Sequence, residues 1–198
     1  MASNISRHSE DWLNKAGLLI EALPYMKRYA NKPVVVKFGG HAMGEQEYVE
    51  SFAADMTLLR QVGAEPIIVH GGGPQIGDML SRLQIKSNFV NGLRVTDAAT
   101  ISVVEMVLAG GINKALVAAI HSAGGRAVGL SGKDGQLITA SKLAELSKPS
   151  DSEIERVDLG FVGRPEKVDP TVLHALLRVG MIPVVAPVGL GLDGQTYN

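Results

Sequence analysis

Three consecutive glycines, Gly71 to Gly73, follow a short apolar run that ends at His70. The run Ile67 to Val69 predicts a buried strand, and Pro74 suits the first turn of a helix, where its missing N–H costs nothing. A strand, a glycine loop and a helix start in this order aim backbone N–H groups and the positive end of a helix dipole at one point. Glycine, lacking Cβ, lets an oxyanion approach the main chain. The stretch predicts a cradle for phosphate or carboxylate; the alternative is a tight turn without a ligand.

A second glycine loop carries a lysine. Lys37 stands near the end of the β-branched run 33–38 and is followed by Gly39 and Gly40. A charged side chain at the end of an apolar strand is costly unless it meets an opposite charge. We expect Lys37 to contact a phosphate; the alternative is a salt bridge to a nearby carboxylate.

An arginine and a further lysine stand in turns. Asn91-Gly92 is a hairpin dipeptide, and Arg94 follows it between apolar neighbours. A guanidinium there can grip a carboxylate through two parallel hydrogen bonds, although it could equally be an exposed strand arginine. Lys133, in the polar glycine loop 131–135, is expected to be a solvated turn lysine, with ligand contact as the alternative.

The elements that must position these residues alternate along the chain. We expect helices over 9–29, 45–62, 75–83, from 97 to Gly110-Gly111, from 113 to Gly124-Gly125 and from 169 to 179, and strands over 33–38, 67–69, 127–130, 137–140, 157–163 and 182–188. Pro24 should kink or divide the first helix, and 141–156 reads as a surface excursion. The alternation predicts an α/β sandwich with a mainly parallel central sheet. Ligand loops of such a sheet lie at the carboxyl ends of strands, where both glycine loops fall.

Composition narrows the classes of partner. The chain has 198 residues, 45% hydrophobic content and a net charge of −1, so neither nucleic acid nor an anionic membrane is an expected partner. The absence of cysteine excludes disulfides and thiolate metal sites and fits a reducing cytoplasm, where we expect the protein. We expect no membrane-spanning segment, because no apolar stretch is long enough to cross a bilayer. We also expect no signal peptide, because the first residues contain no apolar run behind a basic start.

Several familiar catalytic motifs are missing from the sequence. There is no G-x-x-x-x-G-K-[ST] loop and no G-x-S-x-G elbow, and Gly73 and Gly77 are one residue too far apart for the dinucleotide fingerprint. The five histidines show no metal-ligand spacing, so no metal site is predicted. Two glycine loops, a lysine and an arginine remain. This is equipment for positioning and neutralising anions, which is most of what phosphoryl transfer requires.

Four motifs together carry a family resemblance. Val36-Lys-Phe-Gly-Gly40, Ile68-Val-His-Gly-Gly-Gly-Pro74, Asn91-Gly-Leu-Arg-Val-Thr96 and Pro183-Val-Val-Ala-Pro-Val-Gly189 resemble the N-acetylglutamate kinases of the amino-acid kinase family. The resemblance spans essentially the whole chain and implies an αβα sandwich. It implies transfer of the γ-phosphoryl of ATP, accompanied by Mg²⁺, to the γ-carboxylate of N-acetyl-L-glutamate in arginine biosynthesis, without a protein-bound prosthetic group.

The resemblance also implies roles for matching residues. Lys37 would be catalytic and would stabilise the transferred phosphoryl group. Donors of N–H groups to the ATP phosphates would be Gly39, Gly40, Gly71 and Gly72. The acetylglutamate site would include Gly72, Gly73, Arg94 and Asn198, with Arg94 on the α-carboxylate.

The resemblance divides the chain into two parts. Residues 33–198 would be the acetylglutamate-binding, N-terminal lobe. Because Asn198 would begin an Asn-x-Asn-Ala-Asp stretch, we expect the C-terminal ATP-binding lobe to be missing and residues 1–198 alone to be inactive and to bind acetylglutamate weakly. Residues 1–32 resemble the helical extension of the arginine-inhibited hexameric members, which serves oligomerisation and the arginine response, and Tyr25 lies where those members contact arginine.

Two other functions stay open at this stage. One is a kinase of another small carboxylate or of carbamate, such as aspartokinase or carbamate kinase. The Asn91-to-Arg94 hairpin is evidence against this alternative. The other is a non-catalytic homologue that binds acetylglutamate or arginine. Lys37 is evidence against it, because a sensor has no use for a lysine that stabilises a phosphoryl group.

Overall fold

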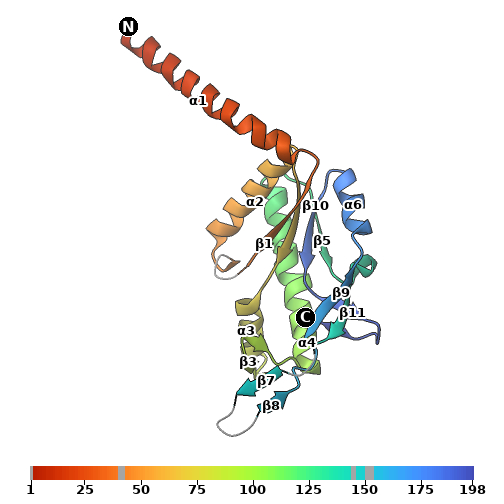
Figure 1. Ribbon diagram of the computed structural model, residues 1–198. Helices are drawn as coiled ribbons and strands as arrows, with labels where there is room; N and C mark the ends of the chain where they lie inside the picture. The colour runs from red at the N-terminus through yellow and green to blue at the C-terminus, as the bar shows by residue number, and fades with distance from the viewer. Residues whose placement is uncertain (1, 40–42, 144–145, 150–153) are drawn as a thin grey trace.

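A four-stranded parallel sheet forms the centre of the computed structural model, which describes residues 2–39, 43–143, 146–149 and 154–198 (Figure 1). The strands occur in the order β1-β2-β10-β5, and every neighbouring pair is parallel. Their bounds are β1 (Pro33–Phe38), β2 (Glu65–His70), β5 (Ala127–Ser131) and β10 (Ile182–Ala186). The sequence predicted all four strands and their parallel arrangement.

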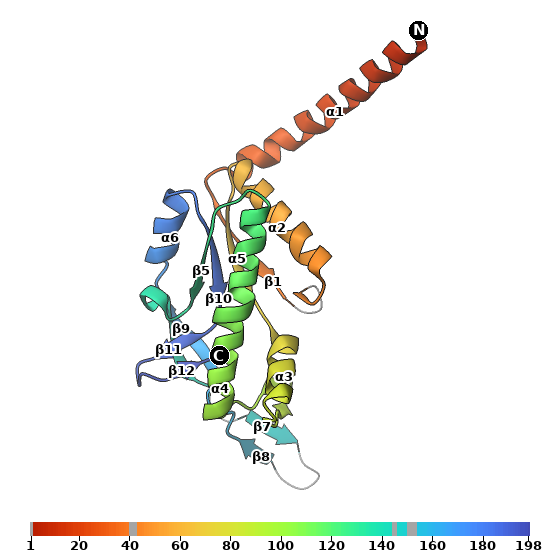
Figure 2. The same cartoon turned by 180° about the vertical axis from the view of Figure 1, so that it is seen from behind.

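Helices cover both faces of this sheet, as expected from strands that are apolar on both sides (Figure 2). On one face, α2 (Gln46–Gln61) and α5 (Asn113–Ser122) pack on side chains such as Ile68 and Val184. On the other, α6 (Thr171–Arg178) packs on the alternate side chains, including Ile67. The expected αβα sandwich is therefore confirmed.

One long helix crosses the first face in three segments. α4 (Ala98–Glu105) continues through η2 (Met106–Ile112), a π-helical segment, into α5. The prediction that the helix ends at Gly110-Gly111 is wrong, because a π-helical turn carries the backbone across both glycines while Val107 and Leu108 stay packed in the core.

The same helix also corrects an expectation about membranes. Ala98–Ser122 is 25 residues long and contains an 18-residue stretch with a mean hydropathy of 1.7, which is enough by length and composition to cross a bilayer. One side of it, however, is buried in two clusters of the protein core, through Val104, Leu108, Leu116 and Ile120 among others, while Met106 is 60% exposed. This is the packing of a core helix.

A smaller sheet lies beyond the carboxyl ends of the central strands (Figure 1). Its order is β12-β11-β6-β9, with bounds β6 (Ile138–Lys142), β9 (Gly163–Val168), β11 (Gly189–Gly191) and β12 (Thr196–Tyr197). Two hairpins accompany it: β3 (Phe89–Val90) with β4 (Leu93–Arg94), and β7 (Leu146–Pro149) with β8 (Ile154–Val157). The predicted strand 157–163 is wrong: Gly160 makes an isolated bridge to Thr96 instead, and the strand begins only at Gly163.

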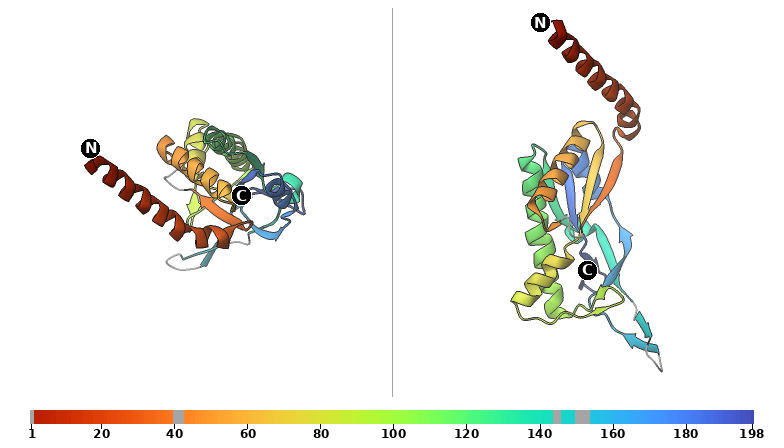
Figure 3. Two further views of the ribbon diagram at one scale, coloured as in Figure 1. Left: turned by 90° about the horizontal axis from the view of Figure 1, so that it is seen from above. Right: turned by 90° about the vertical axis from the view of Figure 1, so that its left-hand side faces the viewer.

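The first helix stands apart from the rest. α1 (Ala2–Tyr29) points away from the body (Figures 1 and 3), and it is not divided at Pro24. Large apolar side chains along it are exposed: Trp12, Leu13, Leu18, Leu19, Ile20, Leu23 and Tyr25.

Candidate functional site

The two glycine loops meet at the carboxyl edge of the central sheet. β1 and β2 are parallel neighbours, so the loops that leave Phe38 and His70 start side by side. The Gly71 N–H donates to the Phe38 carbonyl at 2.9 Å. A Cβ built on Gly39 would lie 3.7 Å from the Gly71 nitrogen, so the two backbones approach closely. Gly40, predicted as a further donor, falls outside the described residues.

The helix after the second loop leaves backbone donors without partners. α3 (Gly73–Arg82) begins with Gly72 as its N-cap and Pro74 in its first turn, as the sequence predicted. Within the described part of the chain, no hydrogen bond engages the N–H groups of Gly72 and Gly73. Orphan donors at a helix start form an anion site. Gly71 was also predicted as a donor to phosphate. Its N–H donates to the Phe38 carbonyl in this structure and so holds the two loops together.

Gly72 packs against side chains of the long helix, whose ends occupy the place of a Cβ. A Cβ there would collide with the Ile112 side chain and would lie 2.7 Å from Leu108 Cδ2. Gly73, its neighbour, meets nothing within 4 Å. The loop therefore contacts the long helix at Gly72 and has open space beside Gly73.

Lys37 is exposed at the end of β1. Phe38 and Val36 pack toward α2 and α5, so Lys37 lies on the opposite face of the strand. In the described part of the chain its ammonium has no hydrogen-bond or ion-pair partner, so the alternative of a structural salt bridge finds no support there. Lys37 remains available to an anion.

Arg94 lies against the triple-glycine loop. The Asn91-Gly92 turn has both residues at positive φ, 50° and 81°, which makes the predicted hairpin and sets Arg94 on its second strand. The Arg94 Nη2 donates to the Gly73 carbonyl at 3.2 Å, Nη1 contacts the Ser87 hydroxyl, and the guanidinium stacks 4.5 Å from the Phe89 ring centroid. Partial burial lowers the pKa of Arg94, but a guanidinium remains a cation at neutral pH.

Backbone pairing brings Asn198 to the base of the same hairpin. Thr96, two residues after Arg94, accepts the Phe161 N–H at 2.7 Å, and the Asn198 N–H donates to the Phe161 carbonyl at 3.1 Å. The Asn198 Oδ1 is buried and has no hydrogen-bond partner among the described residues. An acceptor in that situation favours a donor from a ligand or another segment. The arrangement can hold an anionic molecule between main-chain N–H groups and a guanidinium.

A buried polar pair beneath the loop escaped the sequence analysis. His70 Nδ1 lies 3.0 Å from the Gly71 oxygen, and Nε2 lies 3.1 Å from the Asn113 Nδ2. Both side chains are buried, at 1% and 0% exposure. Burial is the main cause that lowers the pKa of His70. The available signal was an asparagine in an otherwise apolar helix face, but its partner is 43 residues away.

Lys133 is not the solvated turn lysine that the sequence suggested. Its Nζ lies 2.8 Å from the Glu105 carboxylate and 3.0 Å from the Thr196 hydroxyl. It ties the loop after β5 to the long helix and to β12.

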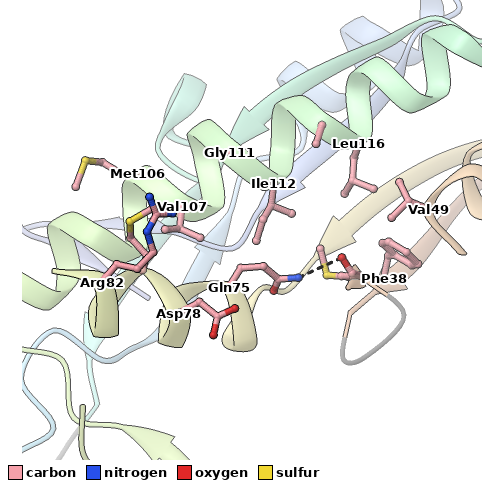
Figure 4. Close-up of a pocket in the computed structure, with 13 residues that line it drawn as sticks. Phe38, Val49, Gln75, Asp78, Arg82, Met106, Val107, Gly111, Ile112 and Leu116 are labelled. Atoms are coloured by element: carbon pink, nitrogen blue, oxygen red, sulfur yellow. Dashed lines mark hydrogen bonds between the residues drawn. The ribbon is translucent and has the colours of Figure 1, made fainter. Parts of the chain in front are cut away.

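An apolar hollow lies between the helices (Figure 4). A cavity of about 510 Å³ opens between α2, α3 and the long helix, lined by Phe38, Val49, Met79, Met106, Val107 and Ile112 among others. Its polar lining includes Gln75, whose Nε2 donates to the Met43 carbonyl at 3.2 Å. None of Lys37, Arg94 and Asn198 lines it, although Ile112, which packs against Gly72, does.

Tyr25 lies at the opposite end of β1 from the glycine loops. It lines an apolar hollow of about 260 Å³ with Met26, Tyr29, Val34, Leu59, Val62 and Ala64. Six residues of strand place this hollow ~20 Å from Gly39. Tyr25 therefore takes no part in the anion site.

No cluster of three or more His, Cys, Asp or Glu side chains that could hold a metal occurs in the residues that the structure describes.

Comparison with known proteins gives a consistent result. Residues 32–198 match the family described as "Amino acid kinase family". The acetylglutamate kinase of Rhodospirillum centenum is 59% identical over 190 residues, which are 96% of this chain and 62% of that protein. The acetylglutamate kinase of Gluconobacter oxydans is 56% identical over 192 residues, 96% of this chain and 65% of that protein. The chain thus spans about three fifths of the length of these curated relatives.

Solved structures share the fold at lower identity. N-acetylglutamate synthase from Neisseria gonorrhoeae superposes with a TM-score of 0.73 at 24% identity, covering 92% of this chain and 40% of that one. Carbamate kinase from Giardia superposes with a TM-score of 0.53 at 15% identity, covering 85% of this chain and 65% of that one.

Proposed function

Because this chain belongs to the amino acid kinase family, we propose that it binds the acceptor in a kinase that phosphorylates the γ-carboxylate of N-acetyl-L-glutamate with ATP, a step of arginine biosynthesis. One observation carries the proposal: the loop that holds the unpartnered N–H groups of Gly72 and Gly73 is also the loop that Arg94 contacts, through the Gly73 carbonyl. The name acetylglutamate kinase, which the 56–59% identical relatives bear, supports this acceptor over carbamate or aspartate.

The acceptor carries two carboxylates, and two kinds of donor suit them. Arg94 binds the α-carboxylate, since a guanidinium with free N–H groups can pair with it in bidentate fashion. Asn198 adds a polar contact through its unpartnered Oδ1, which suits the acetamido N–H. Gly72 and Gly73 hold the γ-carboxylate and the incoming phosphoryl group at the start of α3.

The barrier to this reaction includes the repulsion between two anionic reactants. Donors that are already oriented lower that barrier because they need no reorganisation during transfer. Gly39 belongs to the facing loop, Gly40 is expected to donate a further N–H to the ATP phosphates, and Lys37 neutralises charge on the moving phosphoryl group. Mg²⁺ enters with ATP as part of the substrate. These are the reactants of a cytoplasmic biosynthetic enzyme.

The direct test is an acceptor assay on the protein made from its complete reading frame. We expect ADP formation that depends on N-acetyl-L-glutamate and Mg²⁺. L-glutamate, L-aspartate and carbamate serve as matched acceptors and should each give at most a few per cent of that rate. Equal or faster turnover with one of them would replace the proposed acceptor, and absence of turnover with all four would contradict kinase function.

We also propose that α1 (residues 1–32 with its linker) is an assembly element that packs against a second copy, and that arginine acts through the hollow next to Tyr25. The support is its apolar surface: Trp12, Leu13 and Ile20 are 67%, 72% and 66% exposed. A helix with such a face normally buries it. Light scattering should give a multiple of the subunit mass, hexameric in the full-length form, that falls when residues 1–30 are deleted. An unchanged mass and unchanged arginine inhibition would refute this role.

A further inference from the structure

The hydrogen bonds beneath the glycine loop have a single consistent direction. The Asn113 Nδ2 lies 2.9 Å from the Val184 carbonyl and 3.2 Å from the Leu130 carbonyl, and carbonyl oxygens only accept. Its Oδ1 lies 3.2 Å from Lys114 Nζ, which only donates. Both ends of the amide therefore agree, and the nitrogen of Asn113 is the atom that faces His70.

The orientation of Asn113 determines the tautomer of His70. The two hydrogens of Nδ2 are shared among three neighbouring acceptors, the Val184 and Leu130 carbonyls and His70 Nε2. Because an amide nitrogen cannot accept a hydrogen bond, a proton on His70 Nε2 would have no acceptor at 3.1 Å, so Nε2 is the unprotonated nitrogen. The proton of the neutral ring is then on Nδ1, which donates to the Gly71 oxygen at 3.0 Å. A proton on Nε2 would face the two hydrogens of the Asn113 amide.

The peptide that joins Gly71 to Gly72 turns this into a statement about the site. In a trans peptide the C=O and the following N–H point in opposite directions, and the described chain has no cis peptide bond. With the Gly71 carbonyl held inward by His70, the Gly72 N–H is directed away from the protein interior. The side chains of Leu108 and Ile112 pack against Gly72 on the side where a Cβ would stand.

We propose that His70 and Asn113 are positioning residues: Asn113 fixes the tautomer of His70, and His70 orients the Gly71–Gly72 peptide so that the Gly72 N–H faces the bound oxyanion. This deepens the proposed function and rests on it for the identity of the anion. The pair touches no reactant. Asn113 also joins the strands β2, β10 and β5 in one contact, so the loop is held to the centre of the sheet rather than to its edge.

Two substitutions of His70 separate positioning from packing. In His70→Asn, the amide nitrogen takes the place of Nδ1 and keeps a donor for the Gly71 carbonyl. In His70→Gln, the amide reaches the place of Nε2, fills more of the space and leaves the Gly71 carbonyl without a donor. A merely structural role favours the larger glutamine, whereas positioning favours the asparagine. A third substitution, Asn113→Leu, removes the amide that faces His70 Nε2 and keeps a similar side-chain volume.

The readout is the Gly72 amide of the ¹⁵N-labelled 198-residue chain, titrated with inorganic phosphate and followed by NMR, together with the ¹⁵N shifts of the His70 ring. We expect the Nδ1–H tautomer and a phosphate-dependent Gly72 shift in the wild type. His70→Asn should keep the phosphate affinity within ~3-fold, while His70→Gln and Asn113→Leu should weaken it ~10-fold or more.

The inference is overturned by an Nε2–H tautomer, by a wild-type Gly72 amide that ignores phosphate, or by equal phosphate affinities in His70→Asn and His70→Gln. It stands if the expected order appears even when the complete protein shows no turnover with N-acetyl-L-glutamate. That second result would refute the proposed function alone.

Discussion

The two ends of β1 differ in how closely their surroundings are packed. At the carboxyl end, loops, helix and buried polar groups pack against one another, and the ends of side chains occupy the place of a Cβ on Gly72. At the amino end, α1 leaves the body and exposes its apolar side chains. The first end is organised within this chain, so its chemistry can be argued from the chain alone. The second exposes an apolar surface, so the role that we propose for α1 depends on a second copy of the chain.

The sharpest contrast is between two isoleucines. Ile68 lies fully buried in the central sheet, and Ile20 is 66% exposed on α1. Ile68→Ala should lower the free energy of unfolding by ~2–5 kcal/mol, because it removes packing and leaves a cavity. Ile20→Ala should change it by less than ~0.5 kcal/mol when the chain is kept monomeric. Urea denaturation of both variants measures this, and similar losses would mean that α1 packs on its own body.

The next effect concerns adjacent glycines. Gly72→Ala places a methyl group against the ends of the Leu108 and Ile112 side chains, so these side chains or the loop must shift. We expect a loss of ~1–3 kcal/mol in stability and ~100-fold in turnover. Gly73→Ala is the control for stability, since its Cβ meets nothing within 4 Å and alanine suits a helix. If both variants were equally stable by urea denaturation, the close approach at Gly72 would be refuted.

Arg94 tests the charged side of the same end. Arg94→Lys keeps the charge but loses the planar fork and the stacking on Phe89. We expect the KM for N-acetyl-L-glutamate to rise ~10–100-fold with little change in the KM for ATP, since a charge-assisted pair contributes ~1.5–3 kcal/mol. Initial-rate kinetics measures both constants. A rise confined to ATP would assign Arg94 to the nucleotide.

The smallest effect is the pH dependence of stability. The pKa of His70 is lowered in the folded chain, so the unfolded chain binds the proton more readily. The free energy of unfolding should therefore fall as the pH drops below about 6.5, the ordinary histidine value, and should stay flat above it. His70→Asn should lack this decline in urea denaturation between about pH 5 and 8. The same decline in the variant would assign it to another group.

Local signals in the sequence predicted several helix boundaries correctly. Gly63 ends α2 at positive φ, Pro74 starts α3 and Asp97 caps α4 through the Thr100 N–H, each from its own chemistry. The catalytic and binding roles of Lys37, Gly39, Gly72, Gly73, Arg94 and Asn198 came from resemblance and stay predictions.

What the sequence missed was set by tertiary contacts. The alternation over 157–163 suggests a strand, but Gly160 packs directly on the Thr96 backbone, a contact that no local pattern reveals. The long helix continues through Gly110-Gly111 because the core packing of the residues before and after them, such as Leu108 and Leu116, outweighs the low helix propensity of glycine. His70 and Asn113 meet only once the sheet and helix are assembled.

One titration tests the central claim, that the carboxyl ends of β1 and β2 form an anion site from main-chain N–H groups and Arg94. The ¹⁵N-labelled 198-residue chain is titrated with N-acetyl-L-glutamate, with N-acetyl-L-glutamine as the control that lacks the γ-carboxylate. We predict saturable shifts of the Gly72 and Gly73 amides and of the Arg94 side chain, much weaker at the two glycines with the control. Shifts confined to the apolar cavity near Met106, or none at the glycines and Arg94, would contradict the account.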